Sequence, residues 1–300
     1  MSHTTATPPW HGVLVATATP FDDELRLDLD RYREHVRWLA ESGCDGVTPN
    51  GSLGEYQVLT ADERAAVVRA AVEAAPDGFS VMPGVAAYGA REARRWAEDA
   101  ADAGADAVML LPPNAYRADA ETVLDHYAEV AAAGLPIVAY NNPIDTKVDL
   151  TPALLARLHG EGLIAGVKEF TGDPRRAYEI AELAPGLDVL IGSDDVTLEV
   201  ALAGAVGWIS GYTNAFPVTC VDLYRACVDH DLERALPLYR LLHPLLRWDA
   251  KVEFVQAIKL SMDMAGRYGG PSRPPRRPLS PEQEASVRRA TEQALAGACR

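Results

Sequence analysis

The sequence predicts an α/β fold, a (β/α)8 TIM barrel with a C-terminal helical appendage. Two observations lead to this prediction. Short, β-rich apolar runs alternate with helical segments rich in Ala, Glu and Arg at spacings of about 20 to 35 residues, the pattern of parallel β/α units. Eight such runs precede residue 231, and eight is the number of strands that closes a barrel.

The eight runs are the expected strands. They lie at residues 13–18, 44–49, 79–84, 105–111, 135–140, 162–168, 188–192 and 205–210. Between them, Thr60 with Glu63 has the form of a capping box, and Asp173-Pro174 is a natural helix start. A doubly wound open sheet is the alternative, and the lack of a G-x-G-x-x-G motif after the first run disfavours it.

The pattern changes after residue 230. We therefore expect a barrel domain over residues 1–230 and a helical extension over residues 231–300, since the later segments have helical spacing with no strand-like run between them. The basic, proline-rich stretch at 271–278 is expected to be an ordered linker, because proline restricts the chain.

The composition limits the partners and the location. A net charge of −15 over 300 residues disfavours nucleic acid and anionic membranes, which repel an acidic protein, but leaves room for a local basic pocket that holds a small carboxylated or phosphorylated substrate. The four cysteines have no C-x-x-C spacing, which favours a reducing compartment. Without a signal-peptide pattern or an apolar run of about 20 residues, a cytoplasmic protein is expected.

Metal and serine-nucleophile chemistry find no support in the sequence. The seven histidines form no H-x-H or H-E-x-x-H motif, and neither a G-x-S-x-G elbow nor a phosphate-binding P-loop occurs. Asp194-Asp195 could hold a cation, but at the start of a helix they more simply act as N-terminal caps. No metal site is therefore predicted.

Polar residues at the carboxyl ends of the strands are the candidates for chemistry, because barrel enzymes place their reacting groups there. Lys168 ends the sixth apolar run. A lysine is rarely buried without a partner, and desolvation lowers its pKa, which makes a neutral amine available to attack a ketone and form a Schiff base. The alternative is a structural lysine paired with a carboxylate such as Glu169.

Two further strand ends complete the candidate site. Tyr140 ends the fifth run, so its phenol is expected beside Lys168, where it could shuttle a proton; alternatively, it is an interior tyrosine. The loop at residues 51–55, with sequence GSLGE, offers backbone N–H groups and a hydroxyl that suit a carboxylate; alternatively, it is a tight turn that needs two glycines.

Four motifs occur in a fixed order along the chain: NGSLGE, YNNP, GVKE and GSDD. Together they resemble the dihydrodipicolinate synthase / N-acetylneuraminate lyase family, from about residue 12 to the end of the chain. The resemblance implies a barrel enzyme that assembles as a homotetramer, a dimer of dimers, and needs no metal or organic cofactor. It also implies a lysine that forms an imine with the C2 carbonyl of pyruvate or another 2-oxo acid, so that a C3–C4 or C3–H bond can break to give an enamine.

The resemblance assigns roles to individual residues. It makes Lys168 the Schiff-base residue and Tyr140 the phenol that transfers protons. Ser52 matches a hydroxyl that helps to hold the carboxylate and to relay the proton, beside backbone N–H groups of the same loop. The predicted substrate-binding residues are Gly51, Leu53, Asp145, Phe170, Gly192 and Ile209.

Four departures from the family pattern bear on the substrate. Leu53 replaces a hydroxy residue, which leaves the carboxylate fewer donors. Asp145 stands where the synthases have an arginine that binds the second substrate's carboxylate, so aspartate semialdehyde would be repelled. Phe170 replaces the threonine of sialic acid lyases, which disfavours a long polyhydroxylated substrate. Ala115 aligns with a tyrosine lent across the subunit interface, and Tyr116 follows one residue later.

These departures favour a class I Schiff-base lyase that dehydrates or deaminates a small 2-oxo acid or its cyclic imine, such as 1-pyrroline-4-hydroxy-2-carboxylate or a 2-oxo-3-deoxy sugar acid. A pyruvate-dependent aldolase, including 4-hydroxy-tetrahydrodipicolinate synthase, is the alternative within the family. A non-catalytic binder of small carboxylates on the same barrel is the alternative from another class.

Overall fold

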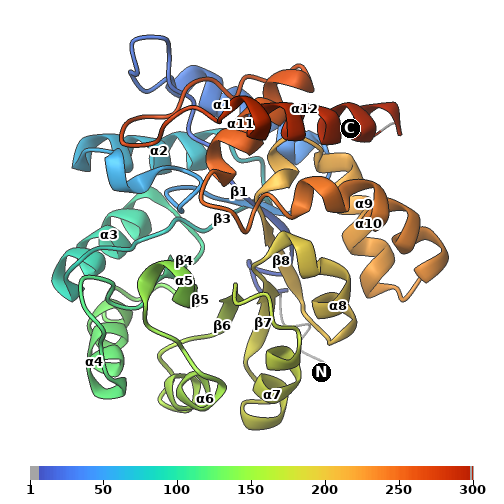
Figure 1. Ribbon diagram of the computed structural model, residues 1–300. Helices are drawn as coiled ribbons and strands as arrows, with labels where there is room; N and C mark the ends of the chain where they lie inside the picture. The colour runs from blue at the N-terminus through green and yellow to red at the C-terminus, as the bar shows by residue number, and fades with distance from the viewer. Residues whose placement is uncertain (1–6, 298, 300) are drawn as a thin grey trace.

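Eight parallel strands form a single sheet in the computed structural model, which describes residues 7–297 and 299. The strands are β1 (Gly12–Ala16), β2 (Gly46–Thr48), β3 (Ser80–Val81), β4 (Val108–Leu110), β5 (Ile137–Asn141), β6 (Gly166–Glu169), β7 (Asp188–Ile191) and β8 (Gly207–Ser210). They pair in the order β3-β2-β1-β8-β7-β6-β5-β4. Figure 1 shows the strands at the centre of the molecule with helices around them.

Backbone contacts between β3 and β4 close the sheet into a barrel. An isolated parallel bridge joins Gly84 to Met109. Next to it, Val85 N donates to Met109 O and Met109 N donates to Pro83 O, with N–O distances of 3.0 and 2.9 Å. Glycine is needed at this closure because a Cβ on Gly84 would lie 2.4 Å from Asn50 O. The predicted TIM barrel is confirmed.

The connecting helices cover the outside of the barrel, except for the short α5, which lies at the carboxyl ends of the strands and lines the cavity there. They are α1 (Leu29–Glu41), α2 (Ala61–Ala74), α3 (Ala90–Ala103), α4 (Ala120–Ala131), α5 (Pro143–Thr146), α6 (Pro152–Gly160), α7 (Arg175–Leu183), α8 (Thr197–Leu202) and α9 (Pro217–Val228). Both expected helix starts are present. Thr60 and Glu63 form a capping box at α2, and at α7 the Asp173 carboxylate accepts a hydrogen bond from Arg175 N.

The observed and expected strands differ most at β6. The apolar run at 162–168 predicts a strand from residue 162, whereas β6 begins at Gly166. Gly162 ends α6 with a φ of 72°, and its N–H donates to His159 O. The residues before Gly166 therefore form a helix-terminating turn, which apolar composition alone does not distinguish from a strand.

In the part of the chain that the structure describes, three helices follow residue 231: α10 (Leu232–Leu246), α11 (Phe254–Met264) and α12 (Pro281–Ala296). α10 packs on α9, and α12 packs on α10 and α11 (Figure 1, orange to red). A buried ion pair links these helices to the loop after β2, because Lys259 Nζ lies 2.8 Å from Glu55 Oε1 and the two side chains are only 2% and 1% exposed. The loop that carries Ser52 is thus held in place by the C-terminal part of the chain.

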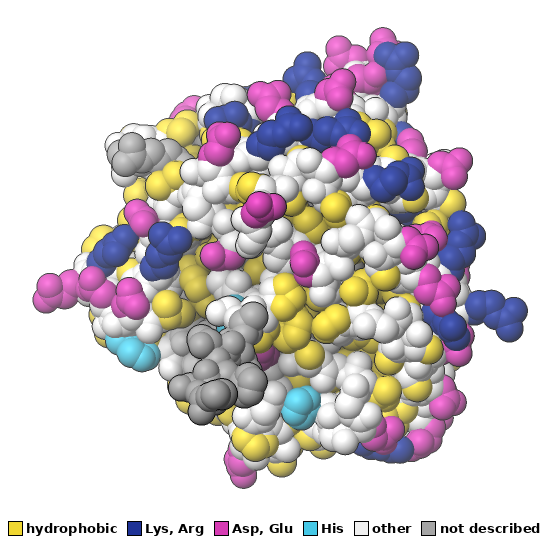
Figure 2. Space-filling view, turned by 180° about the vertical axis from the view of Figure 1, so that it is seen from behind, with side chains coloured by type: hydrophobic (Ala, Val, Ile, Leu, Met, Phe, Trp, Pro, Cys, Tyr) yellow, Lys and Arg dark blue, Asp and Glu magenta, His cyan; other side chains and the backbone are white. Residues whose placement is uncertain are grey.

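The outer surface mixes charges of both signs. Figure 2 shows acidic and basic side chains interspersed on the face opposite to that of Figure 1, without a broad basic area that would attract an anionic polymer. None of the described helices is long and apolar enough to cross a membrane.

Candidate active site

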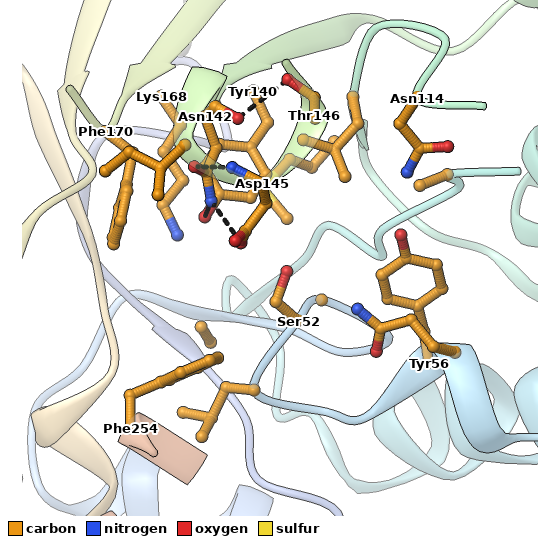
Figure 3. A pocket seen from close by; sticks show the side chains of 18 of the residues that line it. Ser52, Tyr56, Asn114, Tyr140, Asn142, Asp145, Thr146, Lys168, Phe170 and Phe254 are labelled. Atoms are coloured by element: carbon orange, nitrogen blue, oxygen red, sulfur yellow. Dashed lines mark hydrogen bonds between the residues drawn. The ribbon is translucent and has the colours of Figure 1, made fainter. Parts of the chain in front are cut away.

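A cavity of about 550 Å³ lies at the carboxyl ends of the strands, within the size range of small-molecule sites. Its walls come from the strand ends, from the loop after β2 and from the C-terminal extension. Seven predicted site residues line it: Gly51, Ser52, Leu53, Tyr140, Asp145, Lys168 and Phe170. Figure 3 shows how several of these side chains converge on the open space.

The pairing of β5 with β6 places Tyr140 and Lys168 side by side. Their Cα atoms are partners in the parallel ladder, and Lys168 Nζ lies 4.5 Å from the centre of the Tyr140 ring. Because alternate residues of a strand face opposite sides of the sheet, two partners at the same level both point to the inside of the barrel. The expected position of Tyr140 beside Lys168 is therefore confirmed.

Lys168 is a buried amine without a carboxylate partner. Its side chain is 5% exposed, and it forms no ion pair with any described residue. Glu169 instead pairs with Arg176, whose Nε lies 3.3 Å from Glu169 Oε2, so the alternative of a Lys168–Glu169 ion pair is wrong. Burial lowers the pKa of Lys168, while the charges of Asp249 and Asp194 act in the opposite direction. The amine is therefore neutral more often than that of a surface lysine.

Asp194 has a structural role that differs from the expected one. Its carboxylate accepts hydrogen bonds from Trp208 Nε1 at 2.9 Å, from Gly211 N at 3.1 Å and from Tyr212 N at 2.9 Å. Asp194 thus holds the chain after β8, and the expectation that it caps its own helix is wrong. Burial raises the pKa of Asp194 to about 6, although these hydrogen bonds and the charge of Lys168 lower it.

Asp249 is a site residue that the sequence analysis missed. It lies between α10 and α11, is 7% exposed, lines the cavity and accepts a 3.4 Å hydrogen bond from Asp194 N. Burial and the charge of Asp194 raise the pKa of Asp249 well above its usual value, while Lys168 lowers it. Gly211 allows this approach, because a Cβ on it would lie 2.6 Å from Asp249 Oδ1. The only sequence signal is an acid next to a tryptophan in the short segment LLRWDA.

The loop after β2 brings the Ser52 hydroxyl into the same cavity, opposite Lys168 (Figure 3). Asn50 turns the chain there with a φ of 56°. The backbone N–H groups of Ser52 and Leu53 donate to no acceptor in the described part of the chain. Two free N–H groups and a hydroxyl make this loop suitable for a small carboxylate.

One amide connects Tyr140 to Asp145. Asn142 Nδ2 donates to Tyr140 Oη at 3.3 Å and to Asp145 Oδ2 at 2.9 Å. Burial raises the pKa of Tyr140 above its usual value of 10.0, helped by the charge of Asp249, so the phenol keeps its proton. Phe170 lies edge-on to the Tyr140 ring, with 6.1 Å between the ring centres, and makes this wall apolar.

Gly192 and Ile209, which the resemblance placed in the pocket, are not among the residues that line this cavity. Ile209 is fully buried in β8. Gly192 packs against the backbone at the end of β6, where a Cβ would lie 2.4 Å from Glu169 O. Tyr116 is 59% exposed and does not line the cavity of its own chain.

A barrel with a buried amine in a cavity at its strand ends is the architecture of a TIM-barrel enzyme. The profile described as the dihydrodipicolinate synthetase family matches residues 9–294. The chain belongs to this family, and it is a lyase of the kind that acts through a Schiff-base lysine.

Similar proteins cover nearly the whole chain. The 4-hydroxy-tetrahydrodipicolinate synthase of Methanothrix thermoacetophila is 35% identical over 282 residues, which are 93% of this chain and 95% of the relative. The synthase of the same name from Methanosphaerula palustris is 32% identical over 286 residues, 93% and 97% of the two chains. Among solved structures, the dihydrodipicolinate synthase of Aquifex aeolicus has a TM-score of 0.90 and 28% identity, covering 95% of this chain and 98% of its own. A prophage protein of the same family from E. coli K12, solved in complex with pyruvate, has a TM-score of 0.88 and 27% identity at the same coverage.

Proposed function

We propose that this chain is a pyruvate-dependent lyase of the aldolase type, the reaction type of a 4-hydroxy-tetrahydrodipicolinate synthase. The observation that carries the proposal is the buried, unpaired amine of Lys168 beside the Tyr140 phenol. Relatives named as such synthases support this reaction over the dehydration or deamination that the sequence alone favoured.

The first half of the reaction forms an imine. Lys168 Nζ attacks C2 of the 2-oxo acid, and the resulting hydroxyl leaves as water once it has taken a proton. Tyr140 is the proposed donor, because burial raises its pKa and keeps the phenol protonated. The Ser52 hydroxyl and the free backbone N–H groups of its loop would hold the substrate carboxylate.

The second half makes or breaks a bond at C3. The iminium withdraws electrons from C3, and C3 loses a proton to the Tyr140 oxygen, which gave up its own proton in the first half, so that an enamine forms. C3 then attacks the carbonyl carbon of an aldehyde, a new C3–C4 bond forms, and the alkoxide oxygen takes up a proton. Water hydrolyses the imine, which releases the product and returns the Lys168 amine. Read backwards, the same steps cleave a C3–C4 bond.

Borohydride trapping with pyruvate tests the proposal. Reduction of the imine is expected to leave a stable pyruvate adduct on the peptide that contains Lys168. Lys251→Met is the matched control, because Lys251 lines the same cavity but is exposed, and this variant should trap pyruvate as the wild type does. A folded wild-type protein that traps none of several 2-oxo acids would instead be a non-catalytic carboxylate binder.

Dehydration or deamination is the second candidate, favoured by Asp145. This carboxylate lines the cavity, where it could pair with a protonated ring nitrogen or a sugar hydroxyl. Product masses separate the two reactions: pyruvate with aspartate semialdehyde is expected to give a condensation product. Turnover of 1-pyrroline-4-hydroxy-2-carboxylate alone would reassign the enzyme as a deaminase.

We further propose a cytoplasmic homotetramer, on the basis of the family resemblance. The exposed Tyr116 ring is then available to a neighbouring subunit. Light scattering on the purified chain is expected to give the mass of four copies, and a stable monomer would contradict this.

A further inference from the structure

The proline-rich segment at 271–278 is fixed beside the cavity. Arg273 forms a double hydrogen bond with Glu63, at 2.7 and 2.6 Å, and its backbone N donates to Glu55 Oε2 at 3.0 Å. At the start of the segment, Pro271 O accepts a 2.7 Å hydrogen bond from the buried Lys259 amine. The segment is therefore held at two points against the barrel.

Arg276, three residues further on, lines the cavity and is half-buried. Its Nη1 donates to Val252 O at 3.2 Å, and its Cζ lies 5.2 Å from the centre of the Phe254 ring. Unlike Arg273, it forms no ion pair with any residue from 7 to 297. Because a guanidinium has five N–H donors, most of its hydrogen-bonding capacity remains unused by the protein.

The other cations of the cavity have fewer free donors. Arg64 donates to Ala86 O and Gly84 O and lies 4.5 Å from the Trp96 ring, while its buried Nε has no hydrogen-bond partner among the described residues. The Lys251 amine lies over the Trp248 ring at 3.7 Å and is exposed. Apart from Lys168, Arg276 is thus the cation of the cavity wall with the most donors left for a ligand.

The position of Arg276 suggests which part of a ligand it would meet. Figure 3 shows Phe254 across the open space from Lys168 and Tyr140, and Arg276 lies over Phe254. Burial lowers the pKa of Arg276, and the charges of Glu55 and Asp145 only partly offset this effect. A half-buried cation without a carboxylate partner is unfavourable, and an anionic group of a ligand would compensate its charge.

We propose that Arg276 binds a second carboxylate of the substrate, remote from the carbonyl that Lys168 attacks. This inference rests on the proposed function, because the imine at Lys168 fixes the other end of the substrate. The planar fork of a guanidinium matches a carboxylate with two parallel hydrogen bonds. A phosphate dianion is less suitable, because Asp145 lines the same cavity. The substrate class is then a dicarboxylic 2-oxo acid.

The test compares two acids that differ only at the far end. The concentrations that give half-maximal borohydride trapping are measured for 2-oxoglutarate and for 2-oxopentanoate, which has a methyl group in place of the second carboxylate. The wild type is expected to prefer 2-oxoglutarate by about 10- to 100-fold, the range for hydrogen bonds to a charged group. R276Q should lower the preference to about 1- to 3-fold. R277Q should keep the wild-type ratio, because Arg277 is exposed and does not line the cavity.

Pyruvate, which has no second carboxylate, separates the possible failures. Equal trapping of it by wild type, R276Q and R277Q shows that the imine chemistry and the fold are intact. If R276Q misfolds, R276M, which retains an apolar stem over Phe254, replaces it in the comparison. The assignment of Arg276 is overturned if the wild type prefers neither 2-oxoglutarate over 2-oxopentanoate nor 2-oxoadipate over 2-oxohexanoate. It is also overturned if the Arg276 variants keep the wild-type preference for the dicarboxylic acid. Absence of pyruvate trapping in the wild type contradicts the proposed function instead.

Discussion

The two sides of the cavity are built in different ways. On the barrel side, Tyr140 and Lys168 stand at the ends of paired strands, and Ser52 lies in the loop directly after a third strand. On the extension side, Asp249 and Arg276 come from irregular segments after α10 and α11. The barrel side is positioned by the backbone ladder, whereas the extension side depends on side-chain contacts.

This difference separates two tasks. Groups on a rigid sheet keep the fixed geometry that bond making requires. Groups on segments held by a few side-chain bonds can vary without disturbing that geometry. We therefore expect changes on the barrel side to reduce turnover, and changes on the extension side to affect stability, selectivity or pH dependence.

The largest effect is expected from Lys168→Met on the barrel side. Without the amine no imine forms, so turnover should fall on the order of 10⁴-fold or more. The fold should survive, because the side chain is buried in a partly apolar site. A coupled assay of product formation, together with a thermal melt, checks both points. If Lys168→Met retains turnover within about 10-fold of the wild type, Lys168 is not the residue that forms the imine.

Tyr140→Phe should lower turnover by about 10²- to 10⁴-fold, the usual range for a lost proton donor. Pyruvate should still be trapped on Lys168, but more slowly, because the amine remains. Tyr178→Phe is the control, since Tyr178 is exposed and lies outside the cavity lining. Equal turnover by Tyr140→Phe and the control would assign the phenol a packing role.

On the extension side, Lys259→Met should act on stability. It leaves Glu55 buried without its cation, which costs about 3–5 kcal/mol of unfolding free energy. Urea unfolding measures the change, and the double variant with Glu55→Gln should recover much of the loss. A change below about 1 kcal/mol would mean that the ion pair does not hold the extension in place.

Asp249→Asn should have the smallest effect and the most specific one. The Asp249 charge raises the pKa of Lys168 against burial, so its removal lets that pKa fall further. Imine formation needs the neutral amine, and its rate with pyruvate rises as pH passes upward through that pKa. The acid limb of the pH profile should therefore move to lower pH, with the plateau rate changed less than about 10-fold. If the acid limb of the pH profile stays in place or moves to higher pH, the Asp249 charge does not raise the pKa of Lys168.

The same contrast explains what the sequence could predict. Strand number, barrel closure and the pairing of Tyr140 with Lys168 follow from local patterns and from the geometry of parallel strands. Asp194 was misassigned because capping rules consider only neighbours in sequence, whereas its partners lie 14 to 18 residues away. Asp249 and Arg276 were missed because no periodic pattern shows where an irregular segment folds back.

The anchors of the 271–278 segment have a practical consequence for redesign. Lys259 and Arg273 bond this stretch to Glu55 and Glu63 of the barrel, so residues 259–278, here called the cassette, can be exchanged as one unit while both acids stay in place. Replacing the cassette with that of a relative would change the wall of the cavity that carries Arg276 and leave Lys168 unaltered. Such chimeras offer a route to new acceptors that leaves the barrel sequence untouched.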